Sequence, residues 1–350
     1  MDRVLRVVVI DDSAYVRKVV REILSRSPFV EVVGTARDGL EALDLVEQLN
    51  PDVVTCDLIM PELDGVGFVR EQMRRRPVPI IIMSIANETA EAALTALDAG
   101  AIDFVQKPTA LASEKIFEVS TELIEKVKAA GNIALNRIPS PPETPIAATS
   151  DAATANVAGT HRVDAVVLGI STGGPQALKR LIPLLPKSFP VPVLMVMHMP
   201  LGYTEMYAAK LNEMSHLEVR EAAEGDEVTS GRVFLAPAGR HLSLKREATG
   251  RVVTHLDARP FSTLHKPAVD VLFQSAAEVY GNRVLGVVMT GMGSDGKEGA
   301  AWIKAQGGLV FTEAESSCVV YGMPAVVMES GLSDKSVALP DMARAIMEIV

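Results

Sequence analysis

The 350-residue sequence has little of what marks several large protein classes. Its two cysteines, Cys56 and Cys318, are too few for a disulfide framework or for a zinc site with four thiolate ligands. No run of about twenty apolar residues occurs, as a membrane-spanning helix requires. The first residues, MDRVLRVVVIDD, carry acids too early for a signal peptide. We therefore expect a cytoplasmic protein without membrane insertion.

Positive charge is also scarce. The chain has 34 Lys and Arg against 44 Asp and Glu, which gives a net charge of −10. Binding to nucleic acid requires clustered Lys and Arg that release the counterions of the phosphates. The short run Arg74, Arg75, Arg76 is interpreted as an exposed helix end, so we expect no nucleic-acid partner.

The length and the pattern of apolar residues predict two domains. A stretch rich in Pro, Ala, Ser and Thr, IPSPPETPIAATSDAATANVAGT, has no apolar period and is typical of a linker. On both sides of it apolar strands alternate with amphipathic helices, which indicates α/β domains with parallel sheets. The predicted boundaries are 1–130 for the first domain, 131–162 for a flexible linker and 163–350 for the second domain.

The two domains differ in their expected topology. The first carries five apolar strands, each followed by a helix, and is predicted to be a five-stranded parallel sheet of the flavodoxin-like type. The second is predicted to be a doubly wound α/β domain. Several β-like runs between Leu217 and Asp257 have no helices between them, so we expect some antiparallel strands there. The segment HKPAVDVLFQSAAEVY is predicted to be a helix.

Acidic residues follow two strands of the first domain. Asp11 and Asp12 close the first strand and Asp57 closes the third, so their carboxylates can converge at the carboxyl edge of the sheet. Three like charges together need a cation, and Mg²⁺ prefers such oxygen ligands. Ser84 and Lys107 follow the fourth and fifth strands, where a hydroxyl and an ammonium can hold a phosphoryl oxygen. Asp12 alone is equally well explained as a helix cap.

These residues belong to three longer motifs. The segments VVVIDDSAYVRKVV, DVVTCDLIMPELDG and FVQKP resemble the receiver domain of bacterial response regulators, over residues 4–128. The resemblance implies that Asp57 is the phosphoacceptor, with Ser84 and Lys107 contacting its phosphoryl group. It also implies a Mg²⁺ site formed by Asp11, Asp12, Asp57 and the carbonyl of Ile59.

The same resemblance places Phe104 at a position where receiver domains carry an aromatic switch residue, commonly tyrosine. Phenylalanine keeps the ring and lacks the hydroxyl.

A glycine-rich turn, LGISTGGP, opens the second domain. It places Ser171 between an apolar strand and a helix, and Pro175 fits the first turn of that helix. The N–H groups of such a turn can bind a phosphate or the oxyanion of a tetrahedral intermediate, and the glycines do not distinguish the two.

Two further residues favour catalysis. His198 ends the next strand and Asp295 follows another buried strand, so both can meet Ser171 at the carboxyl edge of the sheet. A serine becomes a nucleophile when a base that is oriented by an acid takes its proton. Each residue alone could instead be a helix cap, or a residue at a strand end whose side chain is hydrogen-bonded to the backbone. Among the other histidines only His265 competes with His198, and we expect it to begin a helix. No cofactor is expected at this site, since no metal-ligand spacing accompanies His198.

The segments GISTGGPQAL, VMHMP, RVFLAPAGRHL, KPAVDVLFQSAA and VVMTGMGSDGKEGA resemble the catalytic domain of the chemotaxis protein-glutamate methylesterases, the CheB family, from about residue 163 to the end. The resemblance implies Ser171 as nucleophile, His198 as general base and Asp295 as orienting acid. It places Thr172 and the N–H of Met292 near the oxyanion.

The family resemblance also implies substrate and control. The expected substrates are glutamate methyl esters on methyl-accepting chemoreceptors, which yield methanol, with receptor glutamines as substrates for deamidation. A CheA-type histidine kinase is the expected phosphodonor, and the receiver is expected to cover the esterase crevice until Asp57 is phosphorylated. Two alternatives stay open: a phosphorylation-controlled binding module, and a nucleotide-binding domain that uses STGGP as an anion loop.

Overall fold

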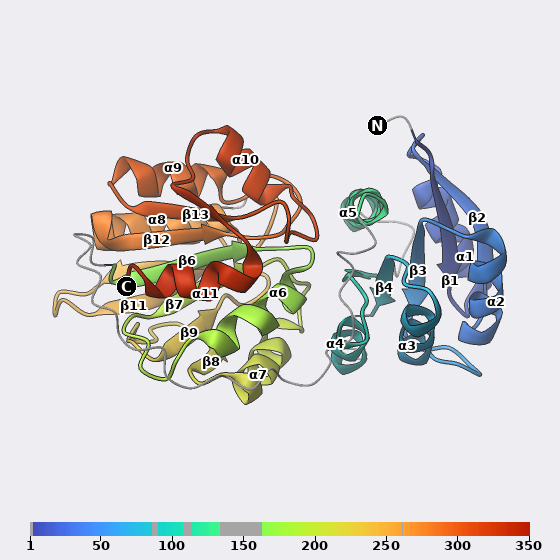
Figure 1. The fold of residues 1–350 in the computed structure, drawn as a ribbon, viewed down its shortest axis with the longest axis horizontal. Coiled ribbons are helices and arrows are strands. Elements are labelled where there is room, and N and C mark those ends of the chain that lie inside the picture. The colour runs from blue at the N-terminus through green and yellow to red at the C-terminus, as the bar shows by residue number, and fades with distance from the viewer. Residues whose placement is uncertain (1–2, 86–89, 108–113, 134–162, 261) are drawn as a thin grey trace. The chain divides into compact units, whose positions relative to one another are not determined.

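A computed structural model describes residues 3–85, 90–107, 114–133, 163–260 and 262–350 (Figure 1). The chain divides into two compact units, Met1–Thr144 and Pro145–Val350. Most of the predicted linker lies outside the described residues, so the boundaries at 131 and 162 stay a prediction.

The first unit is a parallel sheet in the order β2-β1-β3-β4-β5. Its strands are β1 (Leu5–Ile10), β2 (Val30–Ala36), β3 (Val53–Asp57), β4 (Ile80–Ser84) and β5 (Asp103–Gln106). They alternate with α1 (Ala14–Leu24), α2 (Gly39–Leu49), α3 (Gly65–Arg75), α4 (Ala90–Asp98) and α5 (Glu114–Gly131). Because α1 and α5 pack together on one face and α2, α3 and α4 on the other, β3 and β4 are buried throughout. The predicted flavodoxin-like fold is confirmed.

Local sequence fixes where the helices of this unit begin. Ser13, Asp38 and Asp64 each accept a hydrogen bond from a backbone N–H in the first turn of the helix that follows. The strand order reverses between β1 and β3, so the residues after these two strands face a common crevice at the carboxyl edge of the sheet.

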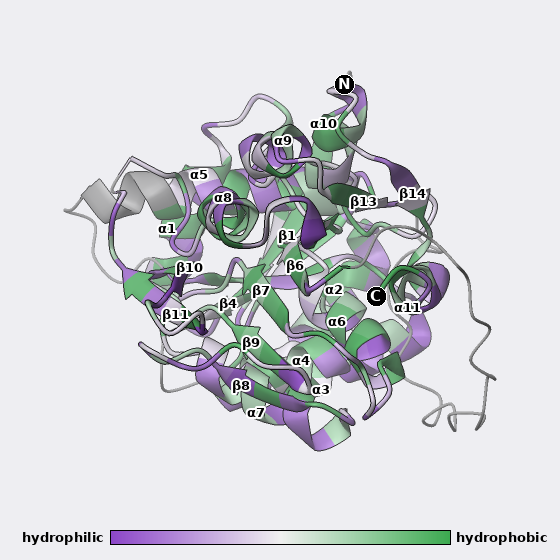
Figure 2. Ribbon diagram, turned by 90° about the vertical axis from the view of Figure 1, so that its left-hand side faces the viewer, coloured by the Kyte–Doolittle hydropathy of each residue, from purple (hydrophilic) through white to green (hydrophobic). Residues whose placement is uncertain are grey.

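The second unit contains a seven-stranded parallel sheet in the order β14-β13-β12-β6-β7-β9-β8. Its strands are β6 (Ala165–Ile170), β7 (Val193–Met197), β8 (Glu218–Glu221), β9 (Arg232–Leu235), β12 (Val284–Val288), β13 (Leu309–Glu313) and β14 (Lys335–Val337). The central strands β6, β7 and β12 are fully buried, and Figure 2 shows β6 and β7 as hydrophobic.

Helices cover both faces of this sheet, as the doubly wound prediction requires. In Figure 1, α8 (Val269–Tyr280), α9 (Lys297–Ala305) and α10 (Met323–Glu329) lie on one side. The other side carries α6 (Gly174–Leu181), α7 (Thr204–Met214) and α11 (Leu339–Met347). Short 3₁₀ turns, Ile182–Leu184 and Gly281–Arg283, follow α6 and α8.

The predicted antiparallel strands are β10 (His241–Arg246) and β11 (Val252–Asp257), which pair with each other outside the main sheet. β8 and β9 come from the same helix-poor region but pair in parallel. The loop 222–231 between them makes this possible, because Gly225 and Val228 donate backbone hydrogen bonds to Thr254 and Val252 of β11. The crossover therefore satisfies its backbone without a helix.

Candidate active site

The first unit brings its acidic residues together as predicted. Asp11, Asp12 and Asp57 each offer a carboxylate oxygen, and these oxygens lie within 4.8 Å of one another. Lys107 Nζ lies 2.7 Å from Asp57 Oδ2 and 2.9 Å from Asp11 Oδ2. Burial raises the pKa of Asp57 above its ordinary value, although the hydrogen bond and charge of Lys107 oppose this. The oxygen-rich donor set fits a hard divalent cation.

The other predicted receiver residues lie on or directly after β3, β4 and β5. Ser84 is buried at the end of β4, where its carbonyl accepts the N–H of Lys107 at 2.8 Å. Ile59 follows β3 and its side chain is exposed. Phe104 is buried on β5, and its carbonyl accepts a hydrogen bond from Lys126 Nζ at 2.8 Å. Lys126 itself is buried, 3.2 Å from Asp103 and 3.0 Å from Glu122.

In the second unit the turn after β6 holds Ser171 at the centre of the sheet. Its N–H donates to Thr290 O at 3.0 Å, and its carbonyl accepts the N–H of Gly174 at 2.7 Å, which closes the turn. Gly173 has φ +81°, in the left-handed region, and a side chain there would also collide with Val319. The serine is thus fixed on both sides through its backbone.

His198 follows the neighbouring strand. Ile170 of β6 pairs with Met197 of β7, and the N–H of His198 donates to Ile170 O at 3.2 Å. Ser171 and His198 therefore leave adjacent strands at the same level. The Nε2 atom of His198 lies 2.8 Å from Asp295 Oδ2. Its Nδ1 atom is buried, and nothing among the described residues hydrogen bonds to it. Nδ1 is therefore the ring atom that can form a further hydrogen bond.

Asp295 lies in the loop after β12, at the start of helix α8. Its two carboxylate oxygens accept the N–H groups of Val269 at 2.8 Å and Asp270 at 3.0 Å, the first two residues of that helix. The positive end of the helix dipole favours a negative charge there. Burial alone would raise the pKa of Asp295, but His198 and the two N–H donors outweigh it and lower the pKa to about 2. Asp295 is therefore ionised at neutral pH.

His265 lies against the face of His198. The two ring centroids are 4.0 Å apart and the rings are inclined by 22°. The expectation that His265 begins a helix is wrong, since α8 begins at Val269. His265 instead belongs to the irregular segment 262–268, which is attached to His241, a buried residue whose Nδ1 accepts the N–H of Ala268 at 3.1 Å.

A chain of buried polar groups supports the turn next to Ser171. Glu313 accepts the N–H of Thr290 at 2.9 Å, and the hydroxyl of Thr290 donates to the carbonyl of Thr172 at 3.0 Å. Burial raises the pKa of Glu313. The hydroxyl of Thr172 is itself buried without a partner in the described part of the chain.

The loop after β12 packs directly on the serine. A Cβ atom on Gly291 would lie 2.8 Å from Ser171 Cβ. The next residue in this loop is Met292, so the backbone that carries it begins beside the nucleophile candidate.

Known families match both units of the chain. A family model described as CheB methylesterase matches residues 166–346, and one described as response regulator receiver domain matches residues 7–118. A Myxococcus xanthus protein named protein-glutamate methylesterase/protein-glutamine glutaminase 5 is 48% identical over 97% of this chain and 96% of its own. The chain belongs to the CheB methylesterase family.

Two further relatives support the assignment. A protein-glutamate methylesterase/protein-glutamine glutaminase from Symbiobacterium thermophilum is 44% identical over 100% of this chain and 98% of its own. The crystal structure of the Thermotoga maritima CheB methylesterase catalytic domain matches with a TM-score of 0.53 and 42% identity, over 54% of this chain and 99% of that one. The chain is thus a methylesterase, and its receiver domain implies control by phosphorylation.

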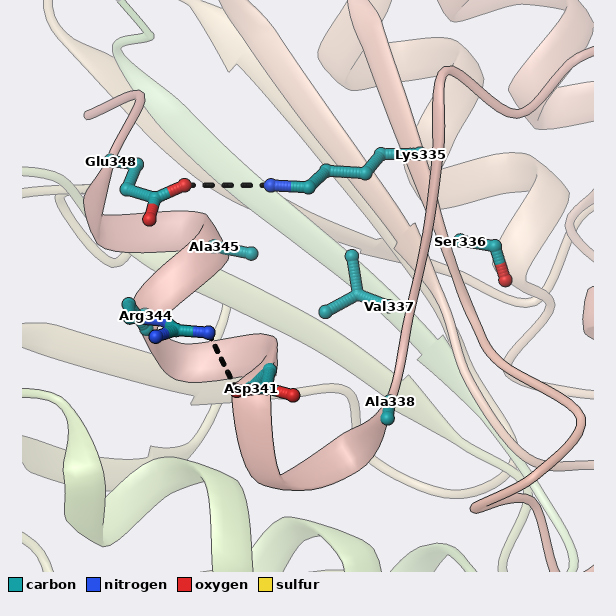
Figure 3. Close-up of a pocket in the computed structure, with 8 residues that line it drawn as sticks. All are labelled: Lys335, Ser336, Val337, Ala338, Asp341, Arg344, Ala345 and Glu348. Carbon is teal, nitrogen blue, oxygen red and sulfur yellow. Dashed lines mark hydrogen bonds and ion pairs between the residues drawn. The ribbon is translucent and has the colours of Figure 1, made fainter.

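A surface pocket of this CheB methylesterase lies away from the serine, at the edge strand β14 and helix α11 (Figure 3). Its volume is about 230 Å³. Its basic side chains face acidic ones, Lys335 at 3.4 Å from Glu348 and Arg344 at 2.7 Å from Asp341. Because these charges pair with each other, we place no ligand there. The pocket is lined by Lys335, Ser336, Val337, Ala338, Asp341, Arg344, Ala345 and Glu348.

Sequence reasoning missed Asp270 and Glu313 around the esterase site, and it considered His265 only as a competitor of His198 at a helix start. Asp270 follows a helix start, where an acid is common, and Glu313 ends an apolar strand. Neither has a local pattern that separates it from an ordinary helix or strand residue.

In the described ranges no helix has the length and apolarity to span a bilayer.

Proposed function

We propose that this CheB methylesterase hydrolyses glutamate methyl esters on methyl-accepting chemoreceptors, with Ser171 as nucleophile, His198 as general base and Asp295 as orienting acid. The observation that carries the proposal is the 2.8 Å contact between His198 Nε2 and Asp295. His198 follows β7, the strand that pairs with the one before Ser171. The other ring nitrogen of His198, Nδ1, has no hydrogen-bond partner among the described residues.

The reaction follows from these roles. His198 takes the proton of the Ser171 hydroxyl through Nδ1 while the serine oxygen attacks the ester carbonyl. The imidazolium that forms is stabilised by the fixed charge of Asp295. His198 then protonates the departing methoxide, which leaves as methanol. Water enters, gives its proton to His198 and releases the glutamate carboxylate, and Ser171 regains its proton.

We assign the oxyanion contacts to Thr172 and to the N–H of Met292. A tetrahedral oxyanion needs donors fixed before the reaction, and Thr172 is held through its carbonyl by Thr290. A glutamine amide passes through the same intermediate with ammonia as the leaving group. The esterase is therefore proposed to deamidate receptor glutamines as well.

In the receiver we propose Asp57 as the phosphoacceptor and a CheA-type histidine kinase as the phosphodonor. Mg²⁺ held by Asp11, Asp12, Asp57 and the Ile59 carbonyl would neutralise charge on the carboxylates and phosphoryl oxygens. We propose that Lys107, at 2.7 Å from Asp57, and the hydroxyl of Ser84 contact the phosphoryl group. Phosphorylation is proposed to raise the turnover of the esterase domain.

Two further assignments accompany this proposal. We propose a receiver at 1–130, a linker at 131–162 and the esterase at 163–350, in keeping with the separation of the chain into two compact units. We propose the cytoplasm as the site of action, where the two buried free thiols, Cys56 and Cys318, stay reduced.

The test is methanol release from methylated receptor, with and without Mg²⁺ and a small phosphodonor. We expect Ser171→Ala to abolish release and Asp57→Asn to remove the response to the phosphodonor. Retained release by Ser171→Ala would return Ser171 to the role of an anion loop, and calorimetric nucleotide binding that is indifferent to His198→Ala would support that alternative. A binding module without chemistry predicts no methanol from the unaltered chain.

A further inference from the structure

At the esterase site, the carboxylates of Asp295 and Asp270 each accept backbone N–H groups from the segment that carries the other residue. Asp295 accepts the N–H groups of Val269 and Asp270 at the start of α8. In return, Asp270 Oδ1 accepts the N–H of Gly296 at 2.9 Å and of Gly299 at 2.7 Å, at the start of α9. The loop that carries Asp295 is therefore attached to α8 in both directions.

We propose that Asp270 is a positioning residue of the esterase: its carboxylate fixes the loop that carries Asp295 and adds a second negative charge beside the Asp295–His198 pair. This inference rests on the proposed roles of Asp295 and His198. Gly296 has φ +96°, a conformation that glycine adopts readily, and a hydrogen bond from its N–H to Asp270 fixes the turn directly after Asp295.

The charge of Asp270 has a catalytic consequence. When His198 takes the serine proton it becomes a cation, which Asp295 contacts directly at 2.8 Å. A charge on Asp270, which interacts with Asp295, is expected to add to that stabilisation. Burial, together with the charge of Asp295, raises the pKa of Asp270 to about 6, so it is mostly ionised at neutral pH. The other ionisable groups on the surrounding elements are His198 after β7, His241 on β10, Asp257 on β11, His265 and Lys266 in the segment 262–268, and Lys297 and Glu298 on α9.

Two substitutions separate the hydrogen bonds from the charge. Asp270→Asn keeps an oxygen that can accept the N–H groups of Gly296 and Gly299, but it removes the negative charge. Asp270→Ala removes both. Asp334→Asn is the matched control, because Asp334 also accepts a backbone N–H, from Val310 at 2.8 Å, on the edge of the same domain.

The experiment measures kcat and KM for methanol release from methylated receptor across pH, with the full chain. We expect the acid limb of kcat/KM for Asp270→Asn to move to lower pH by about 0.5–1.5 units, since the protonated His198 loses one attractive charge. Asp334→Asn should leave the limb in place. Asp270→Ala should lower kcat roughly 10- to 100-fold with KM nearly unchanged, because Asp295 is no longer held.

The outcomes are distinguishable from failure of the proposed function. If Ser171→Ala still releases methanol, the triad assignment falls. If Ser171→Ala is inactive and the pH profile of Asp270→Asn coincides with that of the unaltered chain, the charge of Asp270 has no role and this inference falls alone. Since Asp270→Asn keeps the acceptor oxygen, the pH test does not depend on the folding of Asp270→Ala.

Discussion

Replacing Gly169 with alanine is expected to damage both the stability and the activity of the esterase domain. Gly169 lies in β6, two residues before Ser171, and faces Val269 of helix α8. A Cβ atom at this position would lie 2.3 Å from Val269 Cγ1 and 2.8 Å from Cγ2. The backbone of Gly169 is outside the left-handed region, so the effect comes from the collision alone.

The size of the effect follows from the packing. Val269 is fully buried, so the collision is relieved mainly by moving α8. Overpacking of this kind costs about 1–3 kcal/mol. For a domain of this size each kcal/mol lowers Tm by about 2–4 °C. The N–H of Val269 also donates to Asp295 at 2.8 Å, so a shift of α8 moves the acid, and we expect kcat to fall roughly 10- to 100-fold.

Urea unfolding followed by fluorescence measures this cost in the esterase domain alone. Trp302 is the single tryptophan of the chain, and it lies on α9 in that domain. A second substitution, Val269→Ala, removes the two methyl groups that the new Cβ would meet. We therefore expect Gly169→Ala to cost less in the Val269→Ala background, with a coupling energy of about 0.5–3 kcal/mol. An unchanged urea midpoint for Gly169→Ala, or an equal cost in both backgrounds, would refute the reasoning.

Three further outcomes are expected. Lys107→Met should weaken the phosphodonor response, measured as acyl phosphate on the receiver, because Asp57 loses the ammonium at 2.7 Å. Lys126→Ala should destabilise the receiver by about 3–5 kcal/mol in thermal unfolding followed by circular dichroism, since it leaves the buried Asp103 unpaired, and the double variant with Asp103→Ala should lose less than the sum. The lowered pKa of Asp295 means that its carboxylate stabilises the fold above its ordinary pKa of 3.8 and loses this effect only as the pH falls toward about 2. On acidification from neutral pH to about pH 4.5 the fold should therefore keep this contribution, and Trp302 fluorescence should stay native; loss of the native fluorescence in this range would contradict it.

The positions of Asp57, Ser171 and His198 could be predicted because the information is local. Each residue ends or follows a buried apolar strand, and parallel strands bring their carboxyl ends to one edge. The same rule places Asp11 after β1. Site residues at the ends of parallel strands are thus the ones whose positions can best be predicted from the sequence alone.

The rest depends on long-range contacts. The stacking of His265 on His198 depends on the position of the segment 262–268, and the buried His241 that contacts this segment comes from β10. The parallel pairing of β8 with β9 likewise depends on backbone partners that the loop 222–231 finds on β11. In helix α7 the apolar and polar residues are poorly separated between the two faces, because the apolar side chains of Met206 and Met214 are exposed.

One residue of the esterase domain, Val269, contributes both to core packing and to the position of Asp295. Val269 fills the space above Gly169 through its side chain and holds Asp295 through its N–H. The absence of a side chain at Gly169 therefore sets the distance between α8 and β6, and this distance sets where Asp295 meets His198. Because one contact serves both purposes, substitutions that repack this part of the core must change catalysis as well as stability, whereas repacking at the β14 edge can change stability alone.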